Sequence, residues 1–146
     1  TGRRRRKAFD KAVSRAGLPL VEAWITEADY THAAGHDGLL RIMQADPAPT
    51  AVVVAEFVSG IGALGAAREA GISVPRELSI VVFNNLEVAN YTTPPLTTVG
   101  LQLSAMGAEG LDMLVSLPAD HEIDATVSQP AELFLRGSTA APSRRR

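Results

Sequence analysis

The fold is decided by the stretch Ala51-Val52-Val53-Val54-Ala55, which is followed along the chain by a second segment of the same kind, Ser79-Ile80-Val81-Val82-Phe83. Continuous apolar runs rich in β-branched residues are typical of strands that are buried on both faces of a parallel sheet. Between them, residues 59–70 have helical periodicity, with Ile61 and Leu64 predicted to point inward. The sequence therefore predicts an α/β fold, a parallel sheet flanked by helices with right-handed crossovers.

The neighbouring segments continue this alternation of helix and strand. On the N-terminal side we expect a helix over residues 4–15, a short strand over residues 21–25, and a helix from Thr31, as N-cap, to Gln44. On the C-terminal side the pattern predicts a short strand at 97–99, an amphipathic helix at 103–117 and a closing strand at 131–136.

Length and composition bound the class of protein. The 146 residues suit one domain, or one domain plus a fragment of another. No apolar run reaches the roughly 20 residues that cross a bilayer, and no signal peptide is recognisable, so we expect a cytoplasmic protein with no membrane partner. Cysteine is absent, and His32 and His36 have no third ligand at a suitable spacing. We therefore expect no metal site and no cofactor.

The net charge of −2 conceals two basic runs, Arg3-Arg4-Arg5-Arg6-Lys7 and Arg144-Arg145-Arg146. A basic run can bind phosphate groups electrostatically. The N-terminal run has no interleaved aromatic residues, and no recognition-helix pattern follows it, so the interpretation that we favour is solvated terminal charge. Phosphate binding stays open as the alternative.

Two polar pairs follow the two apolar segments. Glu56-Phe57 comes after the first and Asn84-Asn85 after the second. In open parallel sheets, ligands bind beyond the carboxyl ends of the strands, so we expect Glu56 and Asn84 to face one cleft. We expect no catalysis, because the sequence around Ser59 lacks the glycine that precedes the nucleophile in a strand-to-helix elbow.

Four stretches in a fixed order carry a family resemblance: Ala55-Glu56-Phe57-Val58-Ser59-Gly60-Ile61-Gly62-Ala63-Leu64, Val74-Pro75-Arg76-Glu77-Leu78-Ser79-Ile80-Val81-Val82-Phe83-Asn84-Asn85, Thr93-Pro94-Pro95-Leu96-Thr97-Thr98-Val99 and Arg136-Gly137-Ser138-Thr139. They resemble the signatures A-N-D-x-x-A-x-G-A-L, V-P-x-D-x-S-V-x-G-F-D-D, P-P-L-T-T-V and R-G-S-T of the lactose/galactose repressor (LacI) family of bacterial transcription regulators. The resemblance covers nearly the whole chain.

The resemblance implies the C-terminal subdomain of a periplasmic-binding-protein-like effector domain. Residues 1–99 and the return strand at 129–139 belong to that subdomain, residues 100–128 belong to an N-terminal subdomain that is otherwise missing, and residues 140–146 are a basic tail. The implied function is to bind a small-molecule effector, a sugar, and to form a homodimer through residues 60–70 and 86–91. DNA is contacted only through the missing N-terminal head. The alternative is a sugar-binding protein of a transport system, and a doubly wound enzyme rests on fold class alone.

The resemblance also implies which residues bind the effector: Arg5, Tyr30, Glu56, Phe57 and Asn84. Guanidinium, amide and carboxylate groups bond adjacent hydroxyls of a sugar, and an aromatic ring packs on its apolar face. The chain departs from the family pattern at both polar pairs, so a nucleoside effector stays open. Each residue also has a structural interpretation: surface charge for Arg5, a helix cap for Tyr30, core for Phe57 and a turn for Asn84.

The helix predicted at 103–117 has an apolar stripe of Leu103, Met106, Leu114 and Leu117. In the family this helix packs on the subdomain that is missing here. Exposed, the stripe would be a patch that soluble monomers rarely tolerate. We therefore expect a second copy of the chain, or a folded-back position of the helix, to cover it, with disorder of the helix as the third outcome.

Overall fold

The computed structural model describes residues 2–27, 29–116 and 129–142. Along these residues the order of elements is α1 (Gly2–Arg15), the 3-10 helix η1 (Glu22–Trp24), α2 (His32–Met43), β1 (Ala51–Val54), α3 (Phe57–Glu69), β2 (Ser79–Phe83), the 3-10 helix η2 (Glu87–Asn90), β3 (Thr97–Gly100), α4 (Leu103–Ser116) and β4 (Glu132–Phe134). The predicted α/β class is confirmed.

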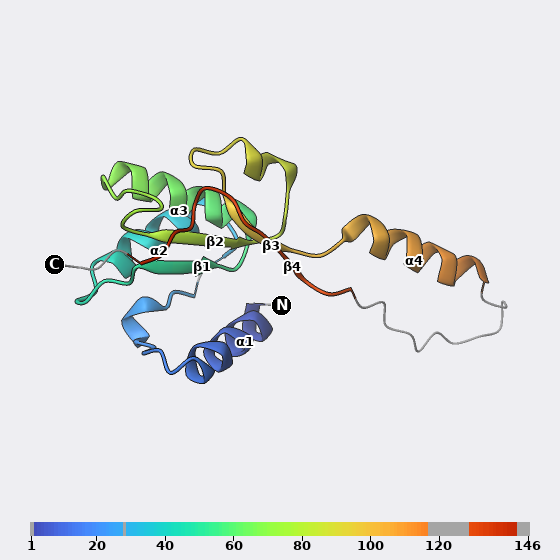
Figure 1. Cartoon of the computed structure of the whole chain (residues 1–146), viewed down its shortest axis with the longest axis horizontal. Coiled ribbons are helices and arrows are strands. Elements are labelled where there is room, and N and C mark those ends of the chain that lie inside the picture. Colours follow the sequence, from blue (N-terminus) through green and yellow to red (C-terminus); the bar gives the residue numbers. More distant parts are fainter. Residues whose placement is uncertain (1, 28, 117–128, 143–146) are drawn as a thin grey trace.

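The described strands form one sheet in the order β1-β2-β3-β4. The first three are parallel, with Val52 opposite Ile80 and Val82 opposite Thr98, and β4 runs antiparallel to β3. Helices α2 and α3 lie together on one face of the sheet, whereas α1 lies on the other side, below β1 in the view of Figure 1. The elements predicted around the two apolar segments are therefore present.

The core lies between α3, α2 and the sheet. Ile80 and Val82 of β2 are fully buried, and Leu78 and Leu96 are buried just outside the strands. On α3 the buried positions are mostly small residues, whereas Ile61 and Leu64 are only partly buried. Small residues occupy the buried side of α3 because this helix packs against both the sheet and α2, and both approach it closely.

Two expectations about the first strands were wrong. Residues 21–25 form the 3-10 turn η1 instead of a strand, because local backbone bonds close the turn and the Trp24 indole donates to the Pro47 carbonyl oxygen at 2.8 Å. As a result β1 is an edge strand of the described sheet. It is not buried on both faces, since Ala51 is exposed and 45% of Val53 is exposed.

Helix α4 extends away from the sheet (Figure 1). Leu103 and Leu114 are each 63% exposed and Met106 is half-buried, whereas Leu117 lies outside the described residues. Within the described part of this single chain, α4 therefore does not fold back to cover its apolar stripe, and cover by a second copy stays a prediction.

The contact between α2 and α3 requires glycine. A Cβ atom on Gly62 would overlap the carbonyl oxygen of His32, and one on Gly35 would overlap the carbonyl oxygen of Ser59. Both obstacles are backbone atoms, which no rotamer change can move away. Helices α2 and α3 can therefore keep this separation only while both positions lack a side chain.

We expect Gly62→Ala to lower the free energy of unfolding by about 2–4 kcal/mol, because α2 and α3 must separate to accept the methyl group. Gly65→Ala is the matched control, since it lies on the same helix and its Cβ position is open. We expect the free energy of unfolding of Gly65→Ala to rise by up to about 1 kcal/mol, because alanine has a higher helix propensity than glycine. Urea denaturation measures both variants, and equal stability of the two would contradict this account of the helix contact.

Candidate functional site

The carboxyl ends of β2 and β3 border a cavity of about 170 Å³. Its lining combines one guanidinium, two amides, an aromatic ring and apolar side chains. Among the lining residues are Arg5, Phe83, Asn84, Asn85, Val99 and Gly100. Two of the five predicted site residues, Arg5 and Asn84, therefore meet here, although about 80 residues of sequence separate them.

Arg5 is held over the sheet by two contacts. Its Nη1 atom donates a hydrogen bond to the Ala55 carbonyl oxygen, and its guanidinium carbon lies 4.6 Å from the centre of the Phe83 ring. These contacts join the first turn of α1 to the ends of β1 and β2. Arg5 is thus a half-buried group at the cavity and not one more solvated cation of the basic run.

The two asparagines after β2 have different environments. Asn84 has a φ angle of 74°, and its backbone N–H donates to the Val99 carbonyl oxygen at 2.8 Å, so the chain turns here in the left-handed region that asparagine tolerates. The Oδ1 atom of Asn85 accepts from Thr98 Oγ1 and from Arg136 Nη2, each at 2.8 Å. Asn85 therefore holds the loop in place, and Asn84 is the amide at the cavity without a side-chain hydrogen bond among the described residues.

Tyr30 and Glu56 lie at a second hollow, of about 140 Å³, between α2 and β1. The Glu56 carboxylate caps α3, since Oε2 accepts from the Val58 N–H at 2.7 Å and from the Ser59 N–H at 3.2 Å. Tyr30 is 50% exposed, and its hydroxyl lies beside Gly2 at the start of α1. Glu56 and Asn84 thus line two different hollows at the same edge of the sheet.

Phe57 is 3% exposed and belongs to the hydrophobic core. Phe57 is the first residue of α3, and its side chain packs in the core instead of facing solvent. Of the two interpretations that the sequence allows, the structure gives Phe57 the core position. We therefore leave it out of the site that we propose below.

Sequence reasoning did not select Phe83 and Arg136 as site residues. Phe83 looked like the end of a buried strand, yet its ring supports the Arg5 guanidinium. Arg136 was noticed only in the R-G-S-T stretch. Its Nη2 atom orients Asn85, and its Nη1 atom donates to the Leu96 carbonyl oxygen at 2.9 Å. Their roles depend on contacts between segments far apart in sequence, which local patterns do not reveal.

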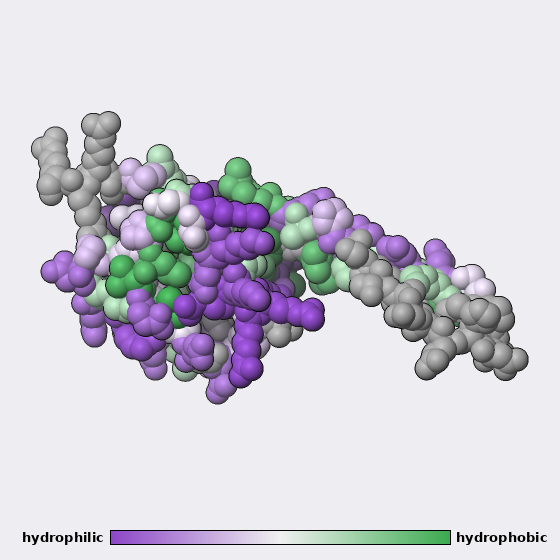
Figure 2. Space-filling model, turned by 90° about the horizontal axis from the view of Figure 1, so that it is seen from below, coloured by the Kyte–Doolittle hydropathy of each residue, from purple (hydrophilic) through white to green (hydrophobic). Residues whose placement is uncertain are grey.

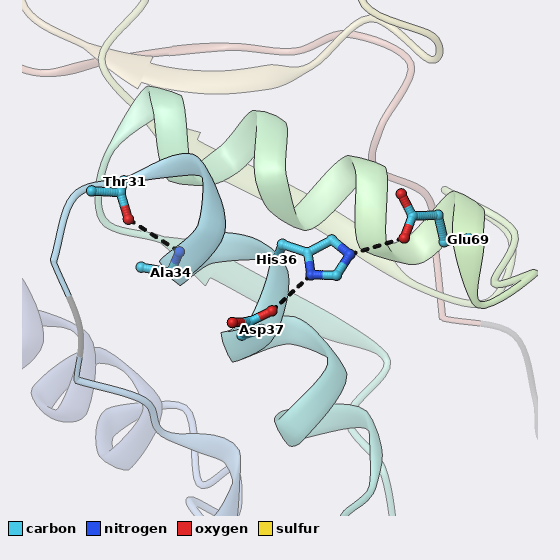
Figure 3. A network of polar contacts seen from close by, with 5 residues as sticks. All are labelled: Thr31, Ala34, His36, Asp37 and Glu69. Carbon is cyan, nitrogen blue, oxygen red and sulfur yellow. Dashed lines mark hydrogen bonds and ion pairs between the residues drawn. The ribbon is translucent and has the colours of Figure 1, made fainter.

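His36, one of the two histidines on α2, forms part of the contact between α2 and α3. His36 on α2 bonds the Asp37 carboxylate through Nδ1 at 2.9 Å and the Glu69 carboxylate of α3 through Nε2 at 3.0 Å (Figure 3). First the Asp37 bond and then the Glu69 bond raise the pKa of His36, and the His36 bond lowers the pKa of Glu69. Within the described residues, no group of histidine and carboxylate side chains could hold a metal ion.

The comparisons with known proteins agree on one family. Residues 1–139 match the model of the periplasmic binding protein-like domain. The transcriptional repressor PurR of Edwardsiella ictaluri is 33% identical over 96% of this chain and 41% of its own length. A LacI-family regulator from Mycobacterium smegmatis superposes with a TM-score of 0.86 and 35% identity, covering 97% of this chain and 53% of that one.

A second solved structure is a sugar-binding LacI-family regulator from Escherichia coli in complex with phosphate. It superposes with a TM-score of 0.80 and 27% identity, over 92% of this chain and 48% of that one. The chain spans about 41% of the length of the first curated relative. The described helices include none that is long and apolar enough to cross a membrane.

The paired shifts at His36 and Glu69 predict a window of added stability. Because the pKa of His36 is raised, its protonated form contributes stability that is fully present below the unfolded pKa of 6.5. This stability is lost as the pH rises through the folded pKa of His36. Because the pKa of Glu69 is lowered, its ionised carboxylate contributes stability that is present above the unfolded pKa of 4.5. This stability is lost as the pH falls through the folded pKa of Glu69. The contact is therefore strongest between pH 4.5 and 6.5.

We expect the difference in unfolding free energy between the parent and His36→Gln to be largest in that window and to shrink toward alkaline pH. Urea titrations at stepped pH measure this difference. His32→Gln is the control on the same helix, because among the described residues the His32 side chain makes no hydrogen bond and its charge is the smallest of the causes that lower the pKa of Glu69. A His36→Gln difference that stays constant from acid to alkaline pH would count against the contact.

Proposed function

Since the chain belongs to the periplasmic binding protein-like domain family, we propose that it is the effector-binding part of a LacI-type transcriptional repressor. The relatives are named as repressors, which favours regulation over sugar transport and over catalysis. Because the chain spans only about 41% of the first curated relative, we propose that the base-specific DNA contact of the complete protein lies in the part outside this chain. A repressor acts on DNA, so we propose a cytoplasmic location.

The observation that carries the proposal is the meeting of Arg5 and Asn84 at the cavity beyond β2 and β3. A guanidinium fork and an amide can bond neighbouring hydroxyl groups of one small molecule. We propose a sugar as the effector, and the description of the E. coli neighbour as sugar-binding supports that class. Tyr30 and Glu56, at the second hollow on the same edge, extend the proposed site.

We propose that this cavity is one half of a cleft. We propose that residues 1–99 and 129–139 form the C-terminal subdomain on one side of this cleft. Residues 100–128 would pack with the rest of the protein. The exposed apolar side chains of α4 support this division, because Leu103, Leu111 and Leu114 are each at least 60% exposed and need a covering surface. The effector would then shift the relative tilt of two subdomains and so change DNA affinity.

We propose a homodimer that uses α3 and the loop after β2. Four large apolar side chains are exposed on these elements: Val58 at 47%, Leu86 at 42%, Val88 at 48% and Tyr91 at 74%. An aromatic residue beside aliphatic ones is the composition that the centre of a protein interface favours.

The proposal is tested by titrating a panel of sugars and nucleosides against the chain by calorimetry. For any ligand that binds, we expect Asn84→Gly to weaken binding by roughly 5- to 100-fold, the effect of losing one or two hydrogen bonds worth about 1–3 kcal/mol. Glycine keeps the left-handed backbone angle accessible, so the fold is preserved. The control is Thr93→Ala, an exposed side chain farther along the same loop.

Two outcomes would refute the proposed site. One is a panel in which no sugar or nucleoside binds the chain. The other is a ligand whose affinity is the same for the parent and for Asn84→Gly.

A further inference from the structure

Helix α1 has an outward face made almost entirely of cations. We call the set Arg3, Arg4, Lys7, Lys11 and Arg15 the basic face of α1. At 3.6 residues per turn, these five positions fall within an arc of about 120° of the helix circumference. All five side chains are exposed, and in the described part of the chain none of them forms an ion pair.

The opposite side of α1 is fixed to the body of the molecule. Arg5 contacts Ala55 and Phe83, as described above. Arg6 Nε donates to the Asp10 carboxylate at 2.7 Å, and the Arg6 guanidinium lies 3.8 Å from the Glu22 carboxylate; the hydrogen bond that Arg6 donates to Asp10 raises the pKa of Arg6. The only carboxylate of α1 is therefore engaged by Arg6, and the basic face keeps its charge. Seen from the side on which α1 lies, this part of the surface is hydrophilic (Figure 2).

We propose that the basic face of α1 is a docking surface for the phosphate backbone of nucleic acid, without regard to base sequence. The five cations extend over roughly 18 Å of helix axis, a length along which one DNA strand presents about five phosphates at ~3.4 Å of axis each. Three of the five are arginines, whose guanidinium fork matches the geometry of phosphate oxygens. The count and the spacing of charge on the two partners are therefore comparable.

The composition of the face argues against other partners. The arc holds no aromatic or large apolar residue, whereas the centre of a protein interface needs such an anchor. A helix that lies on a membrane presents its apolar face to lipid, but Phe9 and Val13 of α1 fall on the side opposite the basic face, which the contacts of Arg5 fix to the body. A repeating polyanion needs neither kind of residue.

The linear sequence concealed this alignment. In sequence the basic run appeared as a cluster at one end, for which solvated charge was the simpler interpretation. The helix separates the run into two groups: Arg5 and Arg6 turn toward the body, and Arg3, Arg4 and Lys7 join Lys11 and Arg15 on the outside. This surface is independent of the proposed effector site and of any DNA-reading segment outside the chain.

The test measures binding of the 146-residue chain to two labelled DNA duplexes of unrelated sequence by fluorescence anisotropy, between about 50 and 200 mM salt. We expect equal affinity for both duplexes and a steep loss of binding as salt rises. The triple variant Arg3→Gln, Lys7→Gln and Lys11→Gln should reduce the slope of log affinity against log salt by roughly 2–3. Glutamine retains helix propensity, and circular dichroism checks that α1 persists.

The matched control neutralises the same number of charges in the tail, Arg144→Gln, Arg145→Gln and Arg146→Gln. We expect this variant to keep most of the parent's slope of log affinity against log salt. It is overturned if neither duplex binds at the lowest salt, if the tail variant loses the slope and the α1 variant keeps it, or if one duplex binds selectively. It is also overturned if a polyglutamate peptide or anionic vesicles bind the basic face and the duplexes do not.

Discussion

The guanidinium group of Arg136 joins the loop after β2 to the beginning of β3. It donates to the Leu96 carbonyl oxygen, to Thr98 Oγ1, to Asn85 Oδ1 and to Asn90 Oδ1, all at 2.7–2.9 Å. One side chain near the C-terminal end thereby joins β3 to both parts of the loop after β2. A planar fork with five donors can do this, and a lysine cannot.

The residues after Arg136 extend the same attachment into the sheet. The Ser138 hydroxyl donates to the Ile80 carbonyl oxygen at 2.6 Å and accepts from the Thr97 N–H at 2.8 Å, while the Ile80 N–H donates to the Ser138 carbonyl oxygen at 2.8 Å. Ser138 and Thr97 are fully buried. Among the described residues, no buried side-chain polar atom lacks a partner. These bonds attach the C-terminal segment to the beginning of β3 and to Ile80 of β2.

The parts of the fold that could be predicted are those whose signal lies within a short stretch of the sequence. Apolar runs located β1 and β2, and helical periodicity located α2 and α3, since those signals lie within about 15 residues. The strand expected at 21–25 failed because Trp24 bonds the Pro47 carbonyl oxygen, which its own sequence does not indicate. The meeting of Arg5 with Asn84 followed from the resemblance alone, and the pairing of Arg136 with Asn85 spans 51 residues. Contacts of that range are set by the folded topology and leave no local pattern.

The most direct test of this account is hydrogen exchange on Arg136→Lys, which keeps the charge and removes the fork. If Arg136 holds the loop after β2 against β3, amide exchange in residues 84–95 should accelerate by more than tenfold, a loss of over about 1.4 kcal/mol of local protection. Exchange in α3 should remain close to that of the parent. Unchanged exchange in residues 84–95, or an equal acceleration throughout the chain, would contradict the claim that Arg136 holds this loop in place.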